Sequence, residues 1–241
     1  MPDKIKHPGS RINVTFSPEI VKGFSYYEYK YLVPHSQFGQ IRNLLDEFLG
    51  NSDPFPSGVV DSIYYDTCNE DFLAQCLDGD ADKLKFRIRG YGDGTYIQVH
   101  QKIKMLSGVG KYKSKIKPLR APKEHAPEWD NIIPEVADGQ IDIIRYHARK
   151  FGMLLPSVRI CYTRYRYRTY DYRITLDSNI EAFSPVNGLP RLKSYACLPY
   201  HVLEVKTKDR RPVLPFNGLI RLQQVSFSKF MLGLNLLNSQ I

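Results

Sequence analysis

Long hydrophobic segments are absent from the sequence. No apolar run approaches the roughly 18 residues that a membrane-spanning helix needs, and residues 1–16 lack the hydrophobic core of a signal peptide. Paired cysteines are also missing, since the four cysteines show neither a CxxC motif nor zinc-ligand spacing, which favours reduced thiols. No block of consecutive lysines and arginines marks a basic tail. We therefore expect a soluble cytoplasmic protein without disulfides.

The composition is that of a globular protein with an excess of positive charge. With 42% hydrophobic and 24% charged residues, the chain is not expected to be disordered, collagen-like or a coiled coil. Seventeen tyrosines and 12 phenylalanines against one tryptophan favour strands, where aromatic rings pack well. The formal charge of +9 indicates nucleic acid, an anionic membrane surface or a small polyanion as partner, or simply a soluble basic surface.

Hydrophobic periodicity predicts a mainly β protein with a few helices. Residues 1–23 contain three prolines and no periodicity, so they are predicted to form an N-terminal arm before a single domain at 24–241. Strands are predicted over 26–33, 59–67, 83–91, 96–104, 109–116, 158–170, 172–179 and 201–208. Helices are predicted over 35–50, 69–77 and 140–151, and in the tail from Leu219, with a break near 226–228.

Cationic residues follow the two-residue period of the predicted strands. From Lys83 to Arg89 every second residue is cationic, and the residues between them are apolar. Because alternate residues of a strand point to opposite faces, such a strand has one basic and one apolar face. On five other predicted strands, the residues that share one face by the same alternation are also mostly polar or charged. These sets are Tyr96, Gln98, His100, Lys102 and Lys104; Tyr26, Glu28 and Lys30; Tyr162, Arg164, Arg166 and Arg168; Arg173, Thr175 and Asp177; and Val202, Glu204, Lys206 and Lys208.

The basic faces have two interpretations. The plainer one is a half-buried antiparallel sheet whose charged face is solvated. Such a face usually mixes signs, because like charges on neighbouring strands repel, whereas here only Glu28, Asp177 and Glu204 interrupt the cations. A barrel that turned these faces inward would form a basic tunnel, in which lysine and arginine bind phosphate oxygens. The sparse carboxylates would suit Mg²⁺ or Mn²⁺ bridging those phosphates.

An ordered set of short motifs resembles a known family. In chain order the motifs are Glu28-Tyr-Lys30-Tyr31, Lys85-Phe-Arg87-Ile-Arg89, Lys102 with Lys104, Tyr162-Thr-Arg164, Arg173-Ile-Thr-Leu-Asp177, Leu203-Glu204-Val205-Lys206 and Ser228-Lys229-Phe230. No single motif is specific, but the set is similar to the VTC domain over about residues 24–234. This is the polyphosphate polymerase domain of the vacuolar transporter chaperone family, among the triphosphate tunnel metalloenzymes, and the likeness is to its bacterial type.

The resemblance implies an eight-stranded antiparallel β-barrel tunnel, with helices packed outside and a C-terminal helix near the tunnel. It implies catalytic contacts with phosphate from Lys30, Arg87, Arg89, Lys102, Arg164, Arg173, Lys206 and Lys229. It also implies substrate binding by Lys85, Lys104, Tyr162 and Ser228, and a divalent cation, Mn²⁺ or Mg²⁺, on Glu204. Three residues depart from the family pattern: Tyr26, His100 in place of an acid, and Ser226 in place of a lysine.

The implied activity is transfer of a nucleotide γ-phosphate to a polyphosphate chain. Two alternatives stay open, a triphosphatase of the same fold and a non-catalytic module that binds polyphosphate or a nucleotide, because one site can admit either water or a phosphate chain. The expected partners are ATP or another nucleoside triphosphate, polyphosphate, and inorganic pyrophosphate or triphosphate. Nucleic acid is not expected, because the cations lie within strands. Association with a membrane would require a separate membrane protein.

Overall fold

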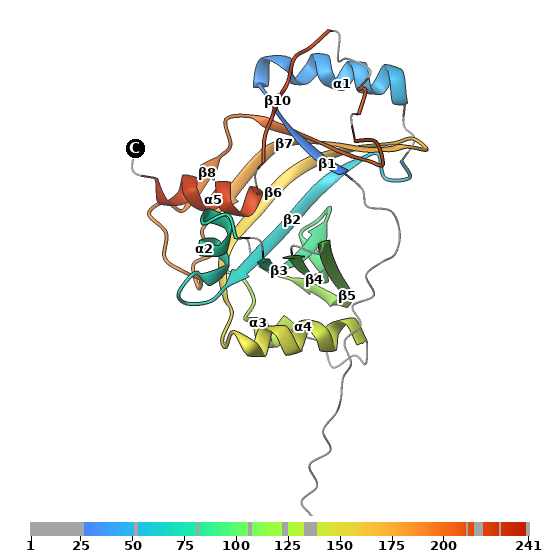
Figure 1. Cartoon of the computed structure of the whole chain (residues 1–241). Coiled ribbons are helices and arrows are strands. Elements are labelled where there is room, and N and C mark those ends of the chain that lie inside the picture. Colours follow the sequence, from blue (N-terminus) through green and yellow to red (C-terminus); the bar gives the residue numbers. More distant parts are fainter. Residues whose placement is uncertain are drawn as a thin grey trace, which may run out of the picture.

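The computed structural model describes residues 27–50, 53–80, 82–105, 108–121, 125–132, 139–210, 212–214, 219–226 and 228–239 (Figure 1). The strands of this part are β1 (Tyr27–Val33), β2 (Ser57–Asp66), β3 (Lys83–Tyr91), β4 (Thr95–Met105), β5 (Gly108–Arg120), β6 (Leu155–Arg168), β7 (Tyr172–Phe183), β8 (Tyr195–Cys197), β9 (His201–Thr207) and β10 (Gln223–Gln224). The helices are α1 (His35–Leu49), α2 (Asp71–Leu77), α3 (Trp129–Ile132), α4 (Gly139–Lys150) and α5 (Lys229–Asn238).

The predicted fold class, a mainly antiparallel β protein with few helices, is confirmed. Each of the eight predicted strands corresponds to one of the eight longer strands, whereas β8, β10 and α3 are not foreseen by the periodicity. The predicted helix in the tail is corrected, because residues 219–226 are not helical and include β10, and the helix begins at Lys229. The predicted arm, residues 1–23, lies outside the described residues.

The strands form one open, curled sheet in the described residues. Their order is β10-β1-β9-β7-β6-β2-β3-β4-β5, with β8 paired to β7, so the edges at β10 and β5 do not pair with each other. The closed eight-stranded barrel is therefore not found there. Alternation determines which face a residue occupies but not whether two edges join, so the sequence pattern does not distinguish an open curled sheet from a barrel.

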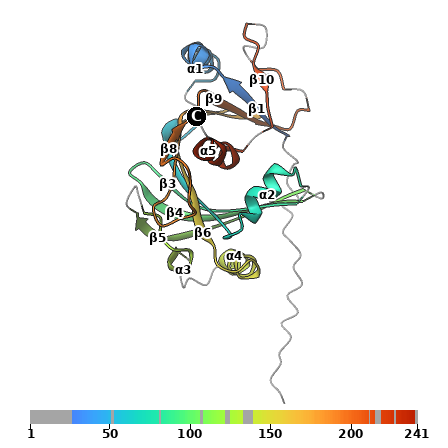
Figure 2. The ribbon, with the colours of Figure 1, turned by 90° about the vertical axis from the view of Figure 1, so that its left-hand side faces the viewer.

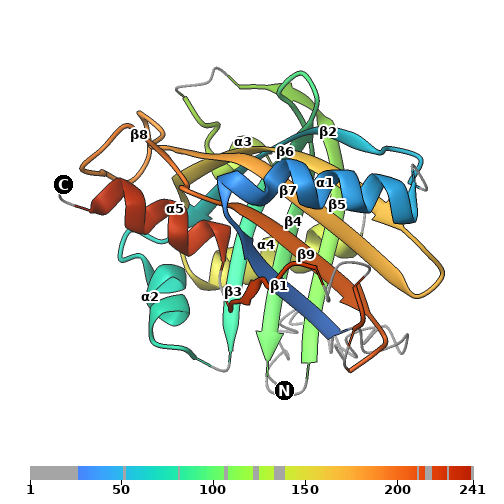
Figure 3. The ribbon, with the colours of Figure 1, turned by 90° about the horizontal axis from the view of Figure 1, so that it is seen from above.

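The curled sheet has two facing walls. We call β1 with β9 the β1–β9 wall and β3 with β4 and β5 the β3–β5 wall; β7, β6 and β2 connect them. Figure 2 shows α1 outside the β1–β9 wall, α3 and α4 outside the β3–β5 wall, and α5 between the two. From above, β1 and β9 run across the strands of the β3–β5 wall (Figure 3). The curl leaves a space that the inner faces of both walls border.

Apolar side chains form three clusters, two outside the walls and one inside. Outside the β3–β5 wall, Phe86 clusters with Trp129 of α3 and Ile144 of α4. Outside the β1–β9 wall, Leu203 clusters with Ile41 of α1. The third cluster places α5 on the inner face of β6 and β7. The apolar strand faces are therefore covered by helices, and the basic faces turn toward the space between the walls.

Gly233 lets α5 lie directly on the sheet. A Cβ atom at this position would lie 2.5 Å from Cδ1 of Ile160 and 3.2 Å from Cβ of Ala182. Both distances are shorter than normal carbon–carbon contacts, which lie near 3.5–4.0 Å. The helix therefore has no room for a larger side chain at this point of contact.

Replacing Gly233 by Leu is expected to lower the free energy of unfolding by about 1–3 kcal/mol, because overpacking displaces side chains and backbone. Urea unfolding followed by circular dichroism measures the loss. The matched control is Asn235→Leu on the exposed side of the same helix, where we expect a change within about 0.5 kcal/mol. Equal losses in the two variants would contradict the close packing of α5.

Candidate functional site

A cavity of about 380 Å³ lies between the walls of the sheet. Its lining comes from the inner faces of seven strands and from the start of α5. The lining residues are Glu28, Lys30, Tyr64, Lys85, Arg87, Arg89, His100, Lys102, Lys111, Tyr162, Arg164, Glu204, Lys206, Ser228 and Lys229. They include nine lysine and arginine side chains and two carboxylates. The cations that alternate along separate strands therefore meet in one space.

All the predicted site residues line this cavity except Arg173 and Lys104. Both have exposed side chains and occupy the predicted face of their strands. Lys104 lies beyond Lys102, near the end of β4, and Arg173 lies opposite Lys206 on β7, which contributes no residue to the lining. The structure therefore does not bring these two side chains into the cavity, because parity gives the face of a strand and not whether a side chain on that face reaches the cavity. Of the residues that depart from the family pattern, Tyr26 lies outside the described residues and Ser226 is exposed away from the cavity.

Hydroxyl groups of β2 and β6 hold Arg87 and Arg89. Arg87 donates from Nη1 to Oη of Tyr64 at 2.8 Å. Arg89 donates from Nε to Oγ of Ser62 at 2.9 Å and from Nη2 to Oη of Tyr162 at 3.4 Å. Burial would raise the pKa of Tyr64, but Arg87 and Arg89 outweigh burial and lower it to about 8. Neutral acceptors thus fix both guanidinium groups without cancelling their charge.

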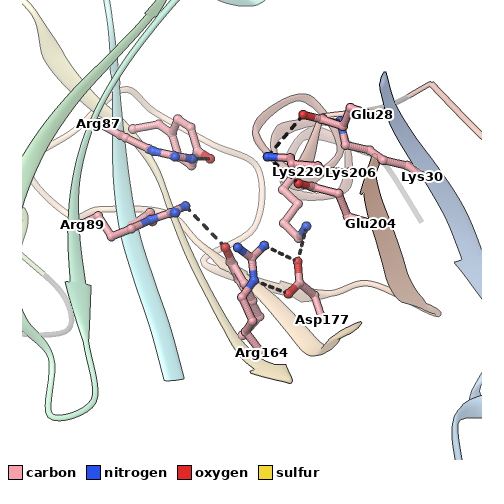
Figure 4. Close-up of polar contacts among 12 residues, drawn as sticks. Glu28, Lys30, Arg87, Arg89, Arg164, Asp177, Glu204, Lys206 and Lys229 are labelled. Atoms are coloured by element: carbon pink, nitrogen blue, oxygen red, sulfur yellow. Dashed lines mark hydrogen bonds and ion pairs between the residues drawn. The ribbon is translucent and has the colours of Figure 1, made fainter. Parts of the chain in front are cut away.

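Asp177 connects the start of α5 to β6 beside the cavity (Figure 4). Arg164 donates from Nε and Nη2 to the two carboxylate oxygens of Asp177 at 2.6 and 2.8 Å. Nζ of Lys229 lies 2.6 Å from Oδ2 of the same carboxylate. Burial would raise the pKa of Asp177, but Arg164 and Lys229 outweigh burial and hold it below its usual value. Lys85 of β3 also donates to Oγ of Ser228 at 2.8 Å, so contacts from two parts of the sheet fix this end of α5.

Two carboxylates of the β1–β9 wall share one lysine (Figure 4). Nζ of Lys206 lies 3.0 Å from Oε1 of Glu204 and 3.5 Å from Oε2 of Glu28. Nζ of Lys30 lies 2.5 Å from Oε1 of Glu28. Burial would raise the pKa of Glu204, but Lys206 and Arg164 outweigh burial and hold it well below its usual value. Glu204 is therefore ionised at neutral pH.

These two carboxylates fit a divalent cation. A single ammonium group contacts both, and Mg²⁺ is usually bound by one or two carboxylates together with phosphate oxygens and water. Within the described ranges, no group of three or more His, Cys, Asp or Glu side chains could hold a metal ion. The residues present therefore suit a cation shared between the protein and a bound phosphate. Glu28, for which the sequence predicts no role, would then be a second ligand beside Glu204.

Strand β5 also contributes to the cavity, although no site residue is predicted on it. Lys111 lies opposite Lys102, and Lys113 lies opposite His100, so these lysines share the inner face of β4. The signal for this face is present in the sequence as a lysine at every second position of 111–117. The same alternation that identifies the basic face of β3 could therefore have identified that of β5.

Tyr96 is predicted on the basic face of β4 but lies in the apolar cluster outside the wall. The register between β3 and β4 shifts between Arg89 and Gly90, which indicates a β-bulge. A Cβ atom on Gly90 would collide with the carbonyl oxygen of Thr95, so glycine permits the close approach of the two strands. The bulge moves Tyr96 to the opposite face, and alternation alone does not reveal it.

Lys111 gives the cavity a charge that depends on pH. It is exposed on the edge strand β5, yet its ammonium group lies among the cavity cations. Burial of this group is the largest cause that lowers the pKa of Lys111 to about 7, and repulsion from Lys113 and Arg87 lowers it further. A polyanion bound nearby would favour the ammonium form and raise that pKa. We therefore expect the contribution of Lys111 to tripolyphosphate affinity to fall as the pH rises from about 6 to about 8, with proton uptake by Lys111 on binding.

Calorimetric titration of tripolyphosphate in buffers with different ionisation enthalpies measures this uptake. Lys111→Arg, whose guanidinium stays charged, is expected to remove the lysine contribution. The matched control is Lys117→Arg, an exposed lysine of the same strand that does not line the cavity. Proton exchange by tripolyphosphate itself contributes equally to the measurements on the wild type and on both variants. Equal proton uptake in the wild type and in Lys111→Arg would show that Lys111 is not the titrating group.

The arrangement defines a class of site, a strongly basic cavity whose charge suits a polyanion. Nine cations surround a space that has two carboxylates on one wall. The chain belongs to the VTC domain family, whose sequence profile matches residues 25–238, and the family resemblance is thus confirmed. Membership indicates a function related to polyphosphate or nucleotides and an enzyme-like chemistry of phosphoryl transfer.

Solved structures resemble the chain distantly. The PH1819 protein from Pyrococcus horikoshii OT3 is 15% identical, with a TM-score of 0.40, over 76% of this chain and 77% of that chain. A putative adenylate cyclase from Bacillus halodurans is 12% identical, with a TM-score of 0.43, over 76% of this chain and 81% of that chain. No curated protein matches the chain. None of the helices in the described part has the length and apolar character to span a membrane.

Proposed function

We propose that the chain is a metal-dependent polyphosphate polymerase of the triphosphate tunnel type, which transfers the γ-phosphate of a nucleoside triphosphate to a polyphosphate chain. The observation that supports this most is the cavity, where nine cations and two carboxylates converge from seven strands and one helix. In this proposal residues 24–241 act as one domain, and the bound polyanion lies between the β1–β9 wall and the β3–β5 wall.

Phosphoryl transfer requires positioning and neutralisation of charge more than covalent chemistry by the protein. Arg87 and Arg89 face Lys206 and Lys229 across the cavity (Figure 4). Cations on opposite sides can hold the donor and the acceptor phosphates in line and stabilise the charge on the transferred group. A divalent cation on Glu28 and Glu204 would supply further neutralisation of the phosphate oxygens.

The proposed transfer of the phosphoryl group needs no general base from the protein. An ionised oxygen of the terminal phosphate of the chain attacks the γ-phosphorus, and a new P–O bond forms. The bond between the γ-phosphorus and the bridging oxygen breaks, its electron pair stays on that oxygen, and the nucleoside diphosphate leaves. Because the attacking oxygen carries no proton at neutral pH, the cavity needs cations rather than a general base. Its lining fits this requirement.

Incubation with ATP, MnCl₂ and a short polyphosphate primer tests the proposal, with chain length read on gels and released phosphate measured in parallel. Growth of the chain is expected, and the double variant Arg87→Ala with Arg89→Ala should abolish it, whereas Lys117→Ala should not. Phosphate release without chain growth would identify a triphosphatase and overturn the polymerase. Tripolyphosphate binding without turnover would identify a non-catalytic module. Duplex DNA should not compete, and recruitment to a membrane by a separate membrane protein stays a prediction.

A further inference from the structure

His100 lies on the inner face of β4 and lines the cavity. Its side chain is buried, with 2% of its surface exposed, and it lies directly opposite Arg87 in the pairing of β3 with β4. Nδ1 of His100 is 3.3 Å from Nε and 3.2 Å from Nη2 of Arg87. Nε2 of the same ring is 2.9 Å from Oε1 of Gln98. Both ring nitrogens are therefore engaged by neighbours.

These contacts determine the protonation of the ring. A guanidinium group only donates hydrogen bonds, so Nδ1 of His100 must accept through its lone pair. The ring proton is then on Nε2, which donates to the amide oxygen of Gln98. Burial, followed by repulsion from Arg87 and Arg89, lowers the pKa of His100 far below its usual value, and Lys111 and Lys113 of β5 act in the same direction. The ring is neutral when it contacts Arg87.

Arg87 is held on two sides and keeps donors for a ligand. Its Nη1 donates to Tyr64, and its Nε and Nη2 share Nδ1 of His100. A guanidinium has five N–H groups, so one on Nη1 and one on Nη2 are left over. An acid in place of His100 could also accept from Arg87, but it would cancel much of the positive charge that phosphate requires.

We propose that His100, oriented by Gln98, is a positioning residue that holds the guanidinium of Arg87 for a phosphate group and leaves its charge intact. The inference rests on the proposed function, because the phosphate group is that of its substrate. It also excludes His100 as a metal ligand, since no ring nitrogen of His100 has a free lone pair. The divalent cation then belongs to Glu28 and Glu204 on the opposite wall.

A double-mutant cycle tests whether His100 acts through Arg87. His100→Leu removes the acceptor and is expected to weaken tripolyphosphate binding about tenfold, in the range of a hydrogen bond to a charged group. His100→Asn places an oxygen near the position of Nδ1 and should retain affinity within about threefold. In an Arg87→Ala background, His100→Leu should cause little further loss. Additive losses would overturn the positioning role.

Two further variants separate charge and metal binding from positioning. His100→Asp keeps an acceptor but adds a negative charge, so without metal it should bind tripolyphosphate more weakly than His100→Asn. Manganese affinity, measured by electron paramagnetic resonance of Mn²⁺ with tripolyphosphate present, should be unchanged in His100→Asn and reduced in Glu204→Gln. A similar loss of Mn²⁺ affinity in His100→Asn would identify His100 as a ligand and overturn the assignment.

Nitrogen-15 NMR of the histidine rings in the free protein examines the bridge without any substrate. An unprotonated Nδ1 and a protonated Nε2 are expected for His100, with a changed Nδ1 shift in Arg87→Ala. A protonated Nδ1 would overturn the proposal even if the protein binds and elongates polyphosphate. Conversely, a wild-type protein without affinity for tripolyphosphate would overturn the proposed function, and the positioning role with it. In that case the ring NMR would still decide whether His100 bridges Arg87 and Gln98.

Discussion

Replacing Glu204 by Gln is expected to reduce metal-dependent nucleotide turnover by about two to three orders of magnitude. The amide keeps the shape of the side chain but removes the charge that a divalent cation needs. Nζ of Lys206, which lies 3.0 Å from the carboxylate, also loses an anionic partner. The cavity becomes more positive, so tripolyphosphate should bind more tightly in the absence of metal. Turnover and metal-free affinity should therefore change in opposite directions.

Turnover of ATP as a function of Mn²⁺ concentration, together with calorimetric titration of tripolyphosphate in EDTA, measures the two effects. The matched control is Glu47→Gln, an exposed glutamate of α1 outside the cavity, which should behave as the wild type. If Glu204→Gln weakened metal-free binding of tripolyphosphate as strongly as it reduced turnover, the substitution would have damaged the cavity itself. The assignment of Glu204 as a metal ligand would then be wrong.

Asp177→Asn is expected to lower the free energy of unfolding by about 3–5 kcal/mol, the cost of leaving buried charges without their partner. The Asp177 side chain is fully buried, and Arg164 and Lys229 both depend on it. Because the pKa of Asp177 is lowered in the folded protein, its contribution is present above about pH 4 and is lost as the pH falls further. Tripolyphosphate should recover part of the loss, since phosphate can contact the two released cations.

Urea unfolding at neutral and acidic pH, with and without tripolyphosphate, measures this prediction. The matched control is Asp142→Asn, which removes the ion pair of the exposed Asp142 with the half-buried Arg145 on α4. Exposed pairs of this kind contribute at most about 1 kcal/mol. A loss at Asp177 no larger than that at Asp142 would mean that the buried pair does not fix α5 to the sheet.

The face of each strand could be predicted from the sequence, because alternation follows from backbone geometry. Lys85, Arg87 and Arg89 share the inner face of β3 as predicted, and Glu204 shares that of β9 with Lys206. These predictions need no knowledge of long-range contacts. The family resemblance follows from the order of the same residues.

Position along a strand and pairing between distant residues could not be predicted in this way. Arg173 has the predicted parity and lies opposite the cavity residue Lys206, yet its exposed side chain is not part of the lining. Asp177 appears in the sequence as an isolated acid, and its pairing with Lys229 depends on where α5 packs. The displaced Tyr96 depends on a bulge at Gly90, whose steric cause is a neighbouring carbonyl group. The open edges of the sheet depend on its curvature.

Because α5 packs inside the curled sheet, the attachment of this helix and the occupancy of the cavity depend on each other. Ser228 at its N-cap and Lys229 at its first position line the cavity, and the ring of Phe230 packs at a tilt against that of Tyr64, with centroids 5.2 Å apart. Detachment of the helix would therefore remove two cavity groups and loosen the hydroxyl that holds Arg87. By thermodynamic linkage, occupancy of the cavity must suppress that detachment. Amide hydrogens of α5 should thus exchange with solvent more slowly whenever the cavity is filled.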